Sequence, residues 1–335
     1  MACLLDMIKR TTLLCCLSLL YLCLFSSCRG TEIIINPESE SEPVARIMIV
    51  PDIQNYTYLE ERFKYLTSIV NYYRLHKDYF DAVLQVGDLT YHNYVWQYEN
   101  AYNYFFRYFN VEDQLVFCLG NHDYGTNGLS DIRTTNMPSY MAPMSDLRMV
   151  DTECENYVRY LTLGGVKYGV IELEFATRNK ALEWANDVLR NDATTPYIIL
   201  LHVFLNKMGA IYDYKDPNIL ISGSHKQYDM SGDGDNYKND SREIFDKIVY
   251  NNPNVKLIIC GHSLTPDYVN VVSETNIIGE PVHIVMINYQ HYGEGGNGFI
   301  GDLEISGEHY RIRSYSTYDI NNKYGNVDIS FGALI

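Results

Sequence analysis

Five apolar runs in this chain each end in a polar side chain of a type that binds metal ions. The runs are rich in Val, Ile and Leu, which is typical of buried strands in a parallel sheet. They are RIMIVPDIQN (46–55), AVLQVGDLT (82–90), QLVFCLGNHDYG (114–125), YIILLHVF (197–204) and VKLIICGHS (255–263). Because ligands in open α/β sheets gather beyond the carboxyl ends of the strands, five such endings predict one shared site. The residues that they deliver are Asp52, Asp88, Asn121 with His122, His202 and His262.

The segments between these runs predict an α/β fold. Helices are predicted from amphipathic spacing at 58–75, 94–109, 177–190 and 241–251. Further strands are predicted as a hairpin around Gly164-Gly165 and at 282–288, 298–304 and 309–315. Helices between the early strands imply parallel crossovers, whereas the late hairpins imply a mixed second half. The chain contains no recognisable repeat or Gly/Ser linker, so residues 44–335 are predicted to form one catalytic domain.

The order of these motifs resembles the calcineurin-like metallophosphoesterases, whose blocks run D-x-H, GD, GNH-D/E, a lone His and GH-x-H. The corresponding segments here are Asp52-Ile53-Gln54, Gly87-Asp88, Gly120-Asn121-His122-Asp123, His202 and Gly261-His262-Ser263-Leu264. The NYQ at 288–290, the GNGF at 296–299 and the SYST at 314–317 also resemble a subgroup with D-x-Q in the first block. The resemblance implies a four-layer α/β/β/α sandwich of two mixed β-sheets flanked by helices. It also implies hydrolysis of phosphoester bonds.

The resemblance further implies two metal sites that share one carboxylate. One site has a complete ligand set here, namely Asp88, Asn121, His202 and His262. The other retains Asp52 and the shared Asp88, but Gln54 replaces one imidazole and Leu264 replaces the other. Leu264 cannot bind a metal, and an amide oxygen is a weaker donor than imidazole for a first-row ion. We therefore expect the second of these ions to bind more loosely, and a single-metal enzyme is the alternative.

The expected cofactors are one or two divalent ions, with Mn, Fe, Zn or Mg as candidates. Asp52, Asp88 and Gln54 suit an oxygen-preferring ion such as Mn²⁺ or Mg²⁺, with waters filling the other positions. The Gln54 amide would equally well orient a water. Taken alone, His202 fits a buried histidine with an ordinary hydrogen bond, and Asn121 and His262 fit turn residues. Only their joint order favours metal binding.

These residue types suit phosphoester hydrolysis for an electrostatic reason. A phosphoester is anionic and repels hydroxide, so two cations about 3.5 to 4 Å apart are needed to neutralise it and to activate a water. The resulting hydroxide would attack phosphorus in line with the leaving oxygen. His122, next to a ligand without being one, would act as the general acid. Asp123 or another carboxylate would hold the His122 imidazole in the required tautomer.

A second hypothesis comes from a different functional class. A cell-surface protein that binds metal or phosphate on the same fold, with weak or no turnover, would also explain the loss of His at positions 54 and 264. The presence of His122 beside a complete ligand set favours the enzyme, because a binding pocket does not need a general acid.

One acidic loop offers a possible calcium site. In DMSGDGDNYKND (229–240), Asp229, Asp233 and Asp240 occupy the first, fifth and twelfth positions of a calcium-binding loop. The twelfth position lacks the usual Glu, and no helix is predicted before the loop. The favoured alternative is a solvated loop in which Asn239 or Asp240 caps the following helix.

The N-terminus predicts export. Lys9 and Arg10 precede the apolar stretch TTLLCCLSLLYLCLF, which ends at Ser26-Ser27-Cys28. At about 15 residues this stretch is shorter than the roughly 20 that a spanning helix needs. We predict a lipoprotein-type signal peptide at 1–27 with Cys28 as the acylated residue, followed by an acidic tether at 28–43. Plain secretion and an uncleaved anchor are the alternatives.

The net charge of the chain limits the kinds of molecule that it is expected to bind. A formal net charge of −16 argues against a nucleic-acid-binding surface, which would require a basic patch. The expected partners are a small-molecule, lipid or nucleotide phosphoester as substrate and, through the lipid on Cys28, a membrane. Specificity is expected to come from the loops at 124–156 and 204–240, which contain no recognisable motif.

Overall fold

The computed structural model describes residues 43–332 except 151–154, 229 and 231. These described residues belong to one compact unit. The predicted signal peptide, Cys28 and nearly all of the predicted tether lie outside the described residues. Within the described part, no helix is both long and apolar enough to cross a membrane.

The first sheet has six strands in the order β13-β12-β11-β1-β2-β3. Their bounds are β1 Val44–Val50, β2 Ala82–Gln85, β3 Leu115–Phe117, β11 Phe299–Ser306, β12 His309–Ser316 and β13 Val327–Gly332. Strands β1, β2 and β3 run parallel to one another, and β11, β12 and β13 are joined to them by antiparallel pairing. The three parallel strands therefore end at the same edge of this sheet.

The second sheet has seven strands in the order β4-β5-β6-β7-β8-β10-β9. Their bounds are β4 Leu147–Arg148, β5 Tyr157–Leu163, β6 Val166–Glu172, β7 Tyr197–Leu200, β8 Val255–Cys260, β9 Val269–Thr275 and β10 Pro281–Ile287. Strands β6, β7, β8 and β10 are parallel, and antiparallel strands flank them on both sides. The predicted hairpin is confirmed, because Gly164 and Gly165 turn between β5 and β6 with φ values of 54° and 82°.

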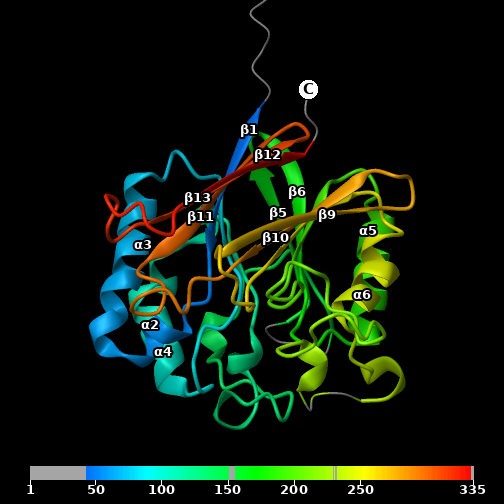
Figure 1. Ribbon diagram of the computed structural model, residues 1–335, viewed down its shortest axis with the longest axis horizontal. Coiled ribbons are helices and arrows are strands. Elements are labelled where there is room, and N and C mark those ends of the chain that lie inside the picture. The colour runs from blue at the N-terminus through cyan, green and yellow to red at the C-terminus, as the bar shows by residue number, and fades with distance from the viewer. Residues whose placement is uncertain (1–42, 151–154, 229, 231, 333–335) are drawn as a thin grey trace, which may run out of the picture. The chain divides into compact units, whose positions relative to one another are not determined.

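Helices cover the outer face of each sheet (Figure 1). They are α2 Gln54–Tyr58, α3 Phe63–Leu75 and α4 Val95–Tyr104 beside the first sheet, and α5 Asn179–Asn191 and α6 Ser241–Ile244 beside the second. A π-helical turn, Phe245–Val249, continues α6. Short 3₁₀ turns occur at Glu60–Arg62, Phe106–Tyr108, Val111–Asp113, Asn121–Asp123, Thr126–Gly128, Ser139–Met141, His225–Gln227 and Gly234–Asn236.

Alternating side chains on the strands separate three hydrophobic cores. On β1, Met48 and Val50 face the helices of the first sheet, whereas Ile47 and Ile49 face the second sheet. On β7, Ile198 faces the first sheet and Ile199 packs with α5 and α6. This arrangement confirms the predicted α/β sandwich of two mixed sheets flanked by helices.

Two predicted helices are shorter in the structure, for backbone reasons. The helix expected at 58–75 is interrupted at Leu59, whose φ of −120° and ψ of 124° are extended, and α3 begins at Phe63. The helix expected at 94–109 ends at Tyr104 because Phe105 leaves the helical region with φ −135° and ψ −73°. Amphipathic spacing alone does not reveal such breaks, because the apolar side chains on either side still reach the same core.

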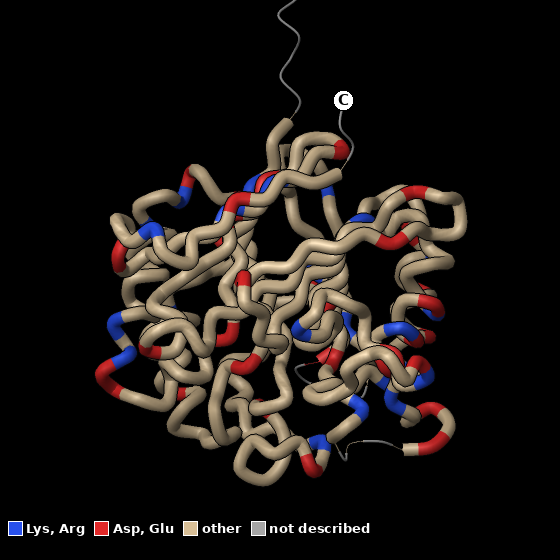
Figure 2. The backbone as a smooth tube through the Cα atoms, in the orientation of Figure 1, with Lys and Arg blue, Asp and Glu red and all other residues tan. Residues whose placement is uncertain are grey.

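Lys and Arg positions are interspersed with Asp and Glu positions over the described chain (Figure 2). Several of these opposite charges pair at the surface, as in Arg311 with Asp328 and Lys256 with Glu280.

Candidate metal centre

The carboxyl ends of parallel strands from both sheets converge on one group of side chains. Asp52 follows β1, Asp88 follows β2, and Asn121 follows β3 in the first sheet. His202 follows β7 and His262 follows β8 in the second. Strand ends separated by more than a hundred residues therefore lie side by side, as the order of the five runs predicts.

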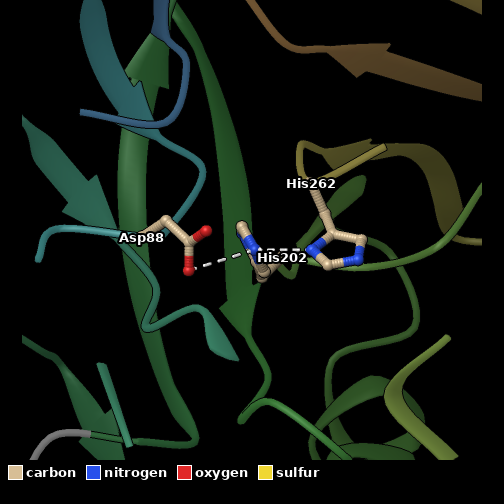
Figure 3. A group of neighbouring side chains, drawn as sticks. All are labelled: Asp88, His202 and His262. Atoms are coloured by element: carbon tan, nitrogen blue, oxygen red, sulfur yellow. Dashed lines mark hydrogen bonds and ion pairs between the residues drawn. The ribbon is translucent and has the colours of Figure 1, made fainter. Parts of the chain in front are cut away.

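His202 lies at the centre of this group. Its Nε2 atom is 3.3 Å from Asp88 Oδ1, 3.1 Å from Asn121 Oδ1 and 3.2 Å from His262 Nδ1. Figure 3 shows Asp88, His202 and His262 directed toward one another from three different segments. The ligand atoms of these three residues all lie within 4.8 Å of one another. They are therefore close enough to bind a single ion.

The tautomers of the two histidines leave lone pairs facing each other. His202 donates from Nδ1 to the Val86 carbonyl at 2.7 Å, and His262 donates from Nε2 to the Gly223 carbonyl at 2.5 Å. Each neutral imidazole has one N–H, so the nitrogens that face each other are both acceptors. Two acceptors 3.2 Å apart, beside the oxygens of Asp88 and Asn121, require a cation or a proton between them. The donor set therefore fits a divalent metal ion of the imidazole-binding type.

The electrostatics of the cluster agree with this requirement. Burial lowers the pKa of His202, but the carboxylates of Asp88 and Asp52 outweigh it and raise that pKa to about 9. Burial would raise the pKa of Asp88, yet the imidazoles of His202 and His122 hold it well below its usual range. Burial and the neighbouring His202 lower the pKa of His262 to about 3. Without a metal the cluster therefore favours a proton on His202, which a bound cation would displace.

Glycines next to the ligands make room for ligands from other strands. A Cβ atom on Gly120 would lie 2.2 Å from Asp88 Oδ1, and one on Gly261 would lie 2.5 Å from Asp52 Oδ1. Two of the ligands are themselves in the left-handed region, Asp88 with φ 52° and His262 with φ 65°. Strained backbone of this kind persists where surrounding contacts fix it, as at functional sites.

We expect Gly120→Ala to weaken metal binding without unfolding the chain. Because the new methyl group would lie 2.2 Å from Asp88 Oδ1 and 2.5 Å from the Asp88 backbone nitrogen, the backbone at Asp88 must shift together with its side chain, at a cost of about 1 to 3 kcal/mol in the free energy of unfolding. Metal titration by calorimetry and thermal unfolding would measure the two effects. Gly165→Ala is the control, since no atom lies within 4 Å of a Cβ built there, although its positive φ adds some strain. Metal affinity in Gly120→Ala equal to that of the parent would contradict this account.

The second predicted metal set is present only in part. Burial raises the pKa of Asp52 to about 8, and both of its oxygens accept hydrogen bonds, from the Asn288 amide at 2.9 Å and from the His262 backbone at 3.4 Å. The Gln54 amide donates to the Gln290 side chain, and its buried Oε1 has no hydrogen-bond partner among the described residues. An orphaned amide oxygen suits a hard cation, so Gln54 fits the oxygen-preferring ion that the sequence analysis expects.

His122 lies at the edge of the cluster and faces a depression of about 450 Å³. Its backbone N–H donates to Asp88 Oδ1 at 3.0 Å, and its Nδ1 donates to the Tyr91 carbonyl at 2.9 Å. The lining residues are Gln54, Asn55, Arg62, Tyr91, His122, Gln290, His291, Gly293 and Gly295. The Nε2 atom of His122 is thereby left as the atom that can exchange a proton with a ligand in this depression.

Asp123 has a different environment from the one expected for a residue that orients His122. Its buried carboxylate accepts hydrogen bonds from the backbone N–H groups of Leu89, Thr90 and Gly120, at 2.9 to 3.0 Å. It thereby ties the loop after β2 to the loop after β3. The hydrogen bond that fixes the His122 tautomer comes instead from the Tyr91 carbonyl, and not from a carboxylate.

Three residues of the site were not selected from the sequence as site residues, namely Asn288, Gln290 and Arg62. Asn288 links the two halves of the site by donating to Asp52 and to the His262 carbonyl. It follows β10, which is parallel to β8, so the rule that found the five segments applies equally to VHIVMINYQ. Arg62 lies in a 3₁₀ turn before α3, where no pattern distinguishes it from an ordinary surface residue.

One acidic residue of the possible calcium loop, Asp240, caps a helix instead of facing an ion. Asp240 is the N-cap of α6, accepting from the Glu243 backbone at 2.8 Å while the Glu243 side chain accepts from the Asp240 backbone. The ammonium group of Lys226 lies 3.7 Å from the same carboxylate. Asp229 is outside the described residues. The alternative that Asp240 caps the helix is thus the one that the structure supports.

Comparisons with known proteins bear on these observations. The family model described as calcineurin-like phosphoesterase matches residues 45–266. No curated protein sequence matches the chain significantly. All structural similarities given below have TM-scores under 0.5.

Three solved structures illustrate the likeness. A purple acid phosphatase from yellow lupin (Lupinus luteus) seeds is 12% identical with a TM-score of 0.48, and the match covers 86% of this chain and 54% of that one. This chain thus spans about half the length of the lupin protein. GAP50, the anchor in the inner membrane complex of Plasmodium, is 10% identical with a TM-score of 0.47, covering 87% and 89%. A dimetal phosphatase from Danio rerio is 12% identical with a TM-score of 0.45, covering 87% and 99%.

The family match spans the strands that carry every candidate ligand from Asp52 to His262, and these side chains lie close together. The chain therefore belongs to the calcineurin-like phosphoesterase family, whose chemistry is the hydrolysis of phosphoester bonds.

Proposed function

We propose that this chain is an exported, metal-dependent hydrolase of phosphomonoesters or phosphodiesters. The observation that carries the proposal is the group of four lone-pair donors formed by His202 Nε2 with Asp88, Asn121 and His262, because its facing acceptors require a cation or a proton between them. Asp88, Asn121, His202 and His262 would hold one ion. Asp52, Gln54 and the shared Asp88 would hold a second, more weakly. Mn²⁺, Fe, Zn²⁺ and Mg²⁺ are the candidate ions.

A divalent ion at this position neutralises phosphoryl oxygens and lowers the pKa of a bound water to near neutrality. The protein contributes the rest of the chemistry. Water supplies the oxygen that bonds to phosphorus, and the bond from phosphorus to the leaving oxygen breaks. His122, which lines the depression, acts in its doubly protonated form: Nδ1 donates to the Tyr91 carbonyl, and the proton on Nε2 passes to the leaving oxygen. The proton lost by the water restores His122 for the next turnover.

Arg62 is the group that we expect to bind the phosphoryl oxygens or a second anionic group of the substrate. It lines the depression together with Gln54 and His122, and its guanidinium makes no ion pair or side-chain hydrogen bond among the described residues. A half-buried, unpaired guanidinium beside a metal site is suited to two-point binding of phosphate. In a chain of net charge −16, such local positive charge is what attracts an anionic substrate.

The proposal includes export and a lipid anchor on Cys28, which follow from the N-terminal sequence alone. The proposed partners are a small-molecule, lipid or nucleotide phosphoester and a membrane, with no nucleic-acid-binding surface. Replacing Cys28 by serine should move the protein from the membrane fraction to the soluble fraction. Retention of Cys28→Ser in the membrane fraction would indicate an uncleaved anchor instead.

The activity is tested with para-nitrophenyl phosphate and its bis ester. Metal-stripped protein is assayed alone and with Mn²⁺, Mg²⁺, Zn²⁺ or Ca²⁺. Hydrolysis that requires an added ion supports the proposal. The relative rates on the two substrates separate a monoesterase from a diesterase.

A protein that binds metal or phosphate with little turnover is the second candidate. The observation in its favour is that the Asp52 carboxylate and the Gln54 amide nitrogen already hydrogen-bond to Asn288 and Gln290, with Leu264 in place of an imidazole. Tight binding of metal or phosphate by calorimetry, with no hydrolysis under any ion, would establish this candidate.

We expect Leu264→His to tighten binding of the second ion, because it supplies an imidazole where the family has one. Manganese titration of the metal-stripped protein should give a second site of higher affinity than in the parent. Leu264→Phe is the matched control, since it changes the size of the side chain without adding a donor. The same stoichiometry and affinity in parent and Leu264→His would contradict the assignment of this site.

A further inference from the structure

Four exposed aromatic rings lie together beside the proposed catalytic residues. They are Tyr58, Tyr91, Tyr94 and Trp96, with exposed fractions of 40%, 36%, 38% and 42%, and we call this group the aromatic platform. Tyr58 stacks on Tyr91 with centroids 5.3 Å apart and planes 28° apart. Trp96 lies 6.1 Å from Tyr58 and 6.2 Å from Tyr94.

The platform is not part of the hydrophobic core. Tyr98, one turn farther along α4, is completely buried and donates to the Asn93 side chain. By contrast, Tyr58, Tyr91 and Tyr94 contact His92 at the surface, and Trp96 contacts Tyr58 and Tyr94. Keeping several aromatic rings together in contact with water is unfavourable unless a ligand covers them, so such patches mark binding sites.

The platform is continuous with the site through Tyr91. The Tyr91 ring lies 5.2 Å from the His122 ring, its carbonyl holds His122 Nδ1, and its side chain lines the depression of Gln54 and Arg62. A leaving group that accepts a proton from His122 Nε2 therefore emerges next to the Tyr91 ring. The remaining rings extend the surface from that point.

We propose that the leaving group of the substrate carries an aromatic ring that stacks on the aromatic platform. This inference rests on the proposed hydrolase function and adds the substrate class. A flat ring gains from stacking on Tyr58 and Tyr91 without needing hydrogen bonds. A sugar would need polar partners for its hydroxyl groups, but the Tyr94 hydroxyl already donates to Asn127 and His92 Nδ1 donates to the Asn127 carbonyl.

The test compares two substrates of equal intrinsic reactivity, 2-phenylethyl phosphate and 2-cyclohexylethyl phosphate. Both release a primary alcohol of similar size and basicity, so they differ in the aromaticity of the ring. With the full chain and Mn²⁺, kcat/KM is measured from phosphate release. We expect the parent to prefer the phenyl ester roughly three- to ten-fold. The double variant Tyr58→Leu, Trp96→Leu should lose this preference while still hydrolysing the cyclohexyl ester.

Tyr250→Leu is the matched control, because Tyr250 is 41% exposed and lies beyond the π-helical turn after α6. It should keep the preference of the parent. A binding measurement by tryptophan fluorescence does not need the double variant. The chain has two tryptophans, so replacing Trp184 leaves Trp96 as the reporter. In Trp184→Phe protein, 3-phenylpropylphosphonate should shift the Trp96 emission, and 3-cyclohexylpropylphosphonate should not.

Each outcome bears on the inference. If both esters are hydrolysed with equal kcat/KM, the proposal that an aromatic leaving group stacks on the platform is overturned, and the hydrolase function remains. Hydrolysis of neither ester, nor of para-nitrophenyl phosphate, overturns the function and the platform with it. A stronger preference for glucose 6-phosphate that the double variant loses would assign the platform to carbohydrate and overturn the aromatic assignment.

Discussion

Replacing His202 by alanine should lower the affinity for a divalent ion at least 100-fold and reduce phosphoester hydrolysis in parallel. The Nε2 atom of His202 lies within 3.3 Å of side-chain atoms of Asp88, Asn121 and His262. Loss of a residue that only orients a ligand already costs about 10- to 100-fold in metal affinity. Removing the central ligand itself should cost more than that.

Metal titration of the stripped protein measures this effect directly, with hydrolysis of para-nitrophenyl phosphate as the second readout. His76→Ala is the control, because His76 is an exposed histidine at the end of α3 whose side chain hydrogen-bonds to the Tyr72 carbonyl one turn earlier. It should bind metal and turn over as the parent does. A His202→Ala protein that binds metal normally would remove the basis of the proposed function.

The same variant should also change the stability of the metal-free protein. His202 and Asp88 are both completely or almost completely buried, and the imidazole is the largest influence that lowers the pKa of the Asp88 carboxyl. Without it, Asp88 remains as a buried carboxylate that has lost its main partner, which costs stability unless it takes up a proton. The apparent pKa of Asp88 should therefore rise in His202→Ala, and its metal-free form should melt below the parent at neutral pH.

The positions of the ligands could be predicted from the sequence because strand ends carry the information. Runs such as YIILL before His202 and VKLIIC before His262 are recognisable from composition, and parallel strands in one sheet necessarily end at a common edge. The meeting of two sheets at one site came from the family resemblance rather than from the runs themselves. The same strand rule reaches Asn288, which directly follows β10 in the NYQ segment.

Other features could not be predicted because they depend on contacts between distant loops. Nothing in the sequence around His122 indicates that its tautomer is fixed by the Tyr91 carbonyl rather than by Asp123. Likewise, the role of Gly223 as the acceptor for His262 arises only when the loop after β7 folds over the site. Backbone carbonyls are present at every residue, so a motif cannot reveal which of them orients a side chain.

The tyrosines illustrate the same limit. Tyr98, inside α4, is fully buried, and Tyr102 on the same helix is partly buried against the same core. Tyr91 and Tyr94 are exposed, because they lie in the loop before α4 and the helical period does not apply to them. The boundary of a single helix thus decides whether a tyrosine is a packing residue or a candidate contact for substrate.

Replacing His122 by asparagine should lower kcat by about 10²- to 10⁴-fold on substrates with a poor leaving group, because the general acid is lost. The reduction should be much smaller for para-nitrophenyl phosphate, whose leaving group departs without a proton. Metal affinity should stay within a few-fold of the parent, since the hydrogen bond to Asp88 comes from the backbone N–H of residue 122.

A series of aryl phosphates of increasing leaving-group basicity makes this test decisive. The logarithm of kcat should fall steeply with basicity in His122→Asn and only weakly in the parent. The control is His76→Asn, because His76 does not line the depression and its side chain hydrogen-bonds to the Tyr72 carbonyl. This variant should have the same slope as the parent. If both lines had the same slope, protonation of the leaving group by His122 would be excluded, and the imidazole would act on binding alone. A steeper slope with unchanged metal affinity in His122→Asn therefore distinguishes a proton donor from a residue that only shapes the site.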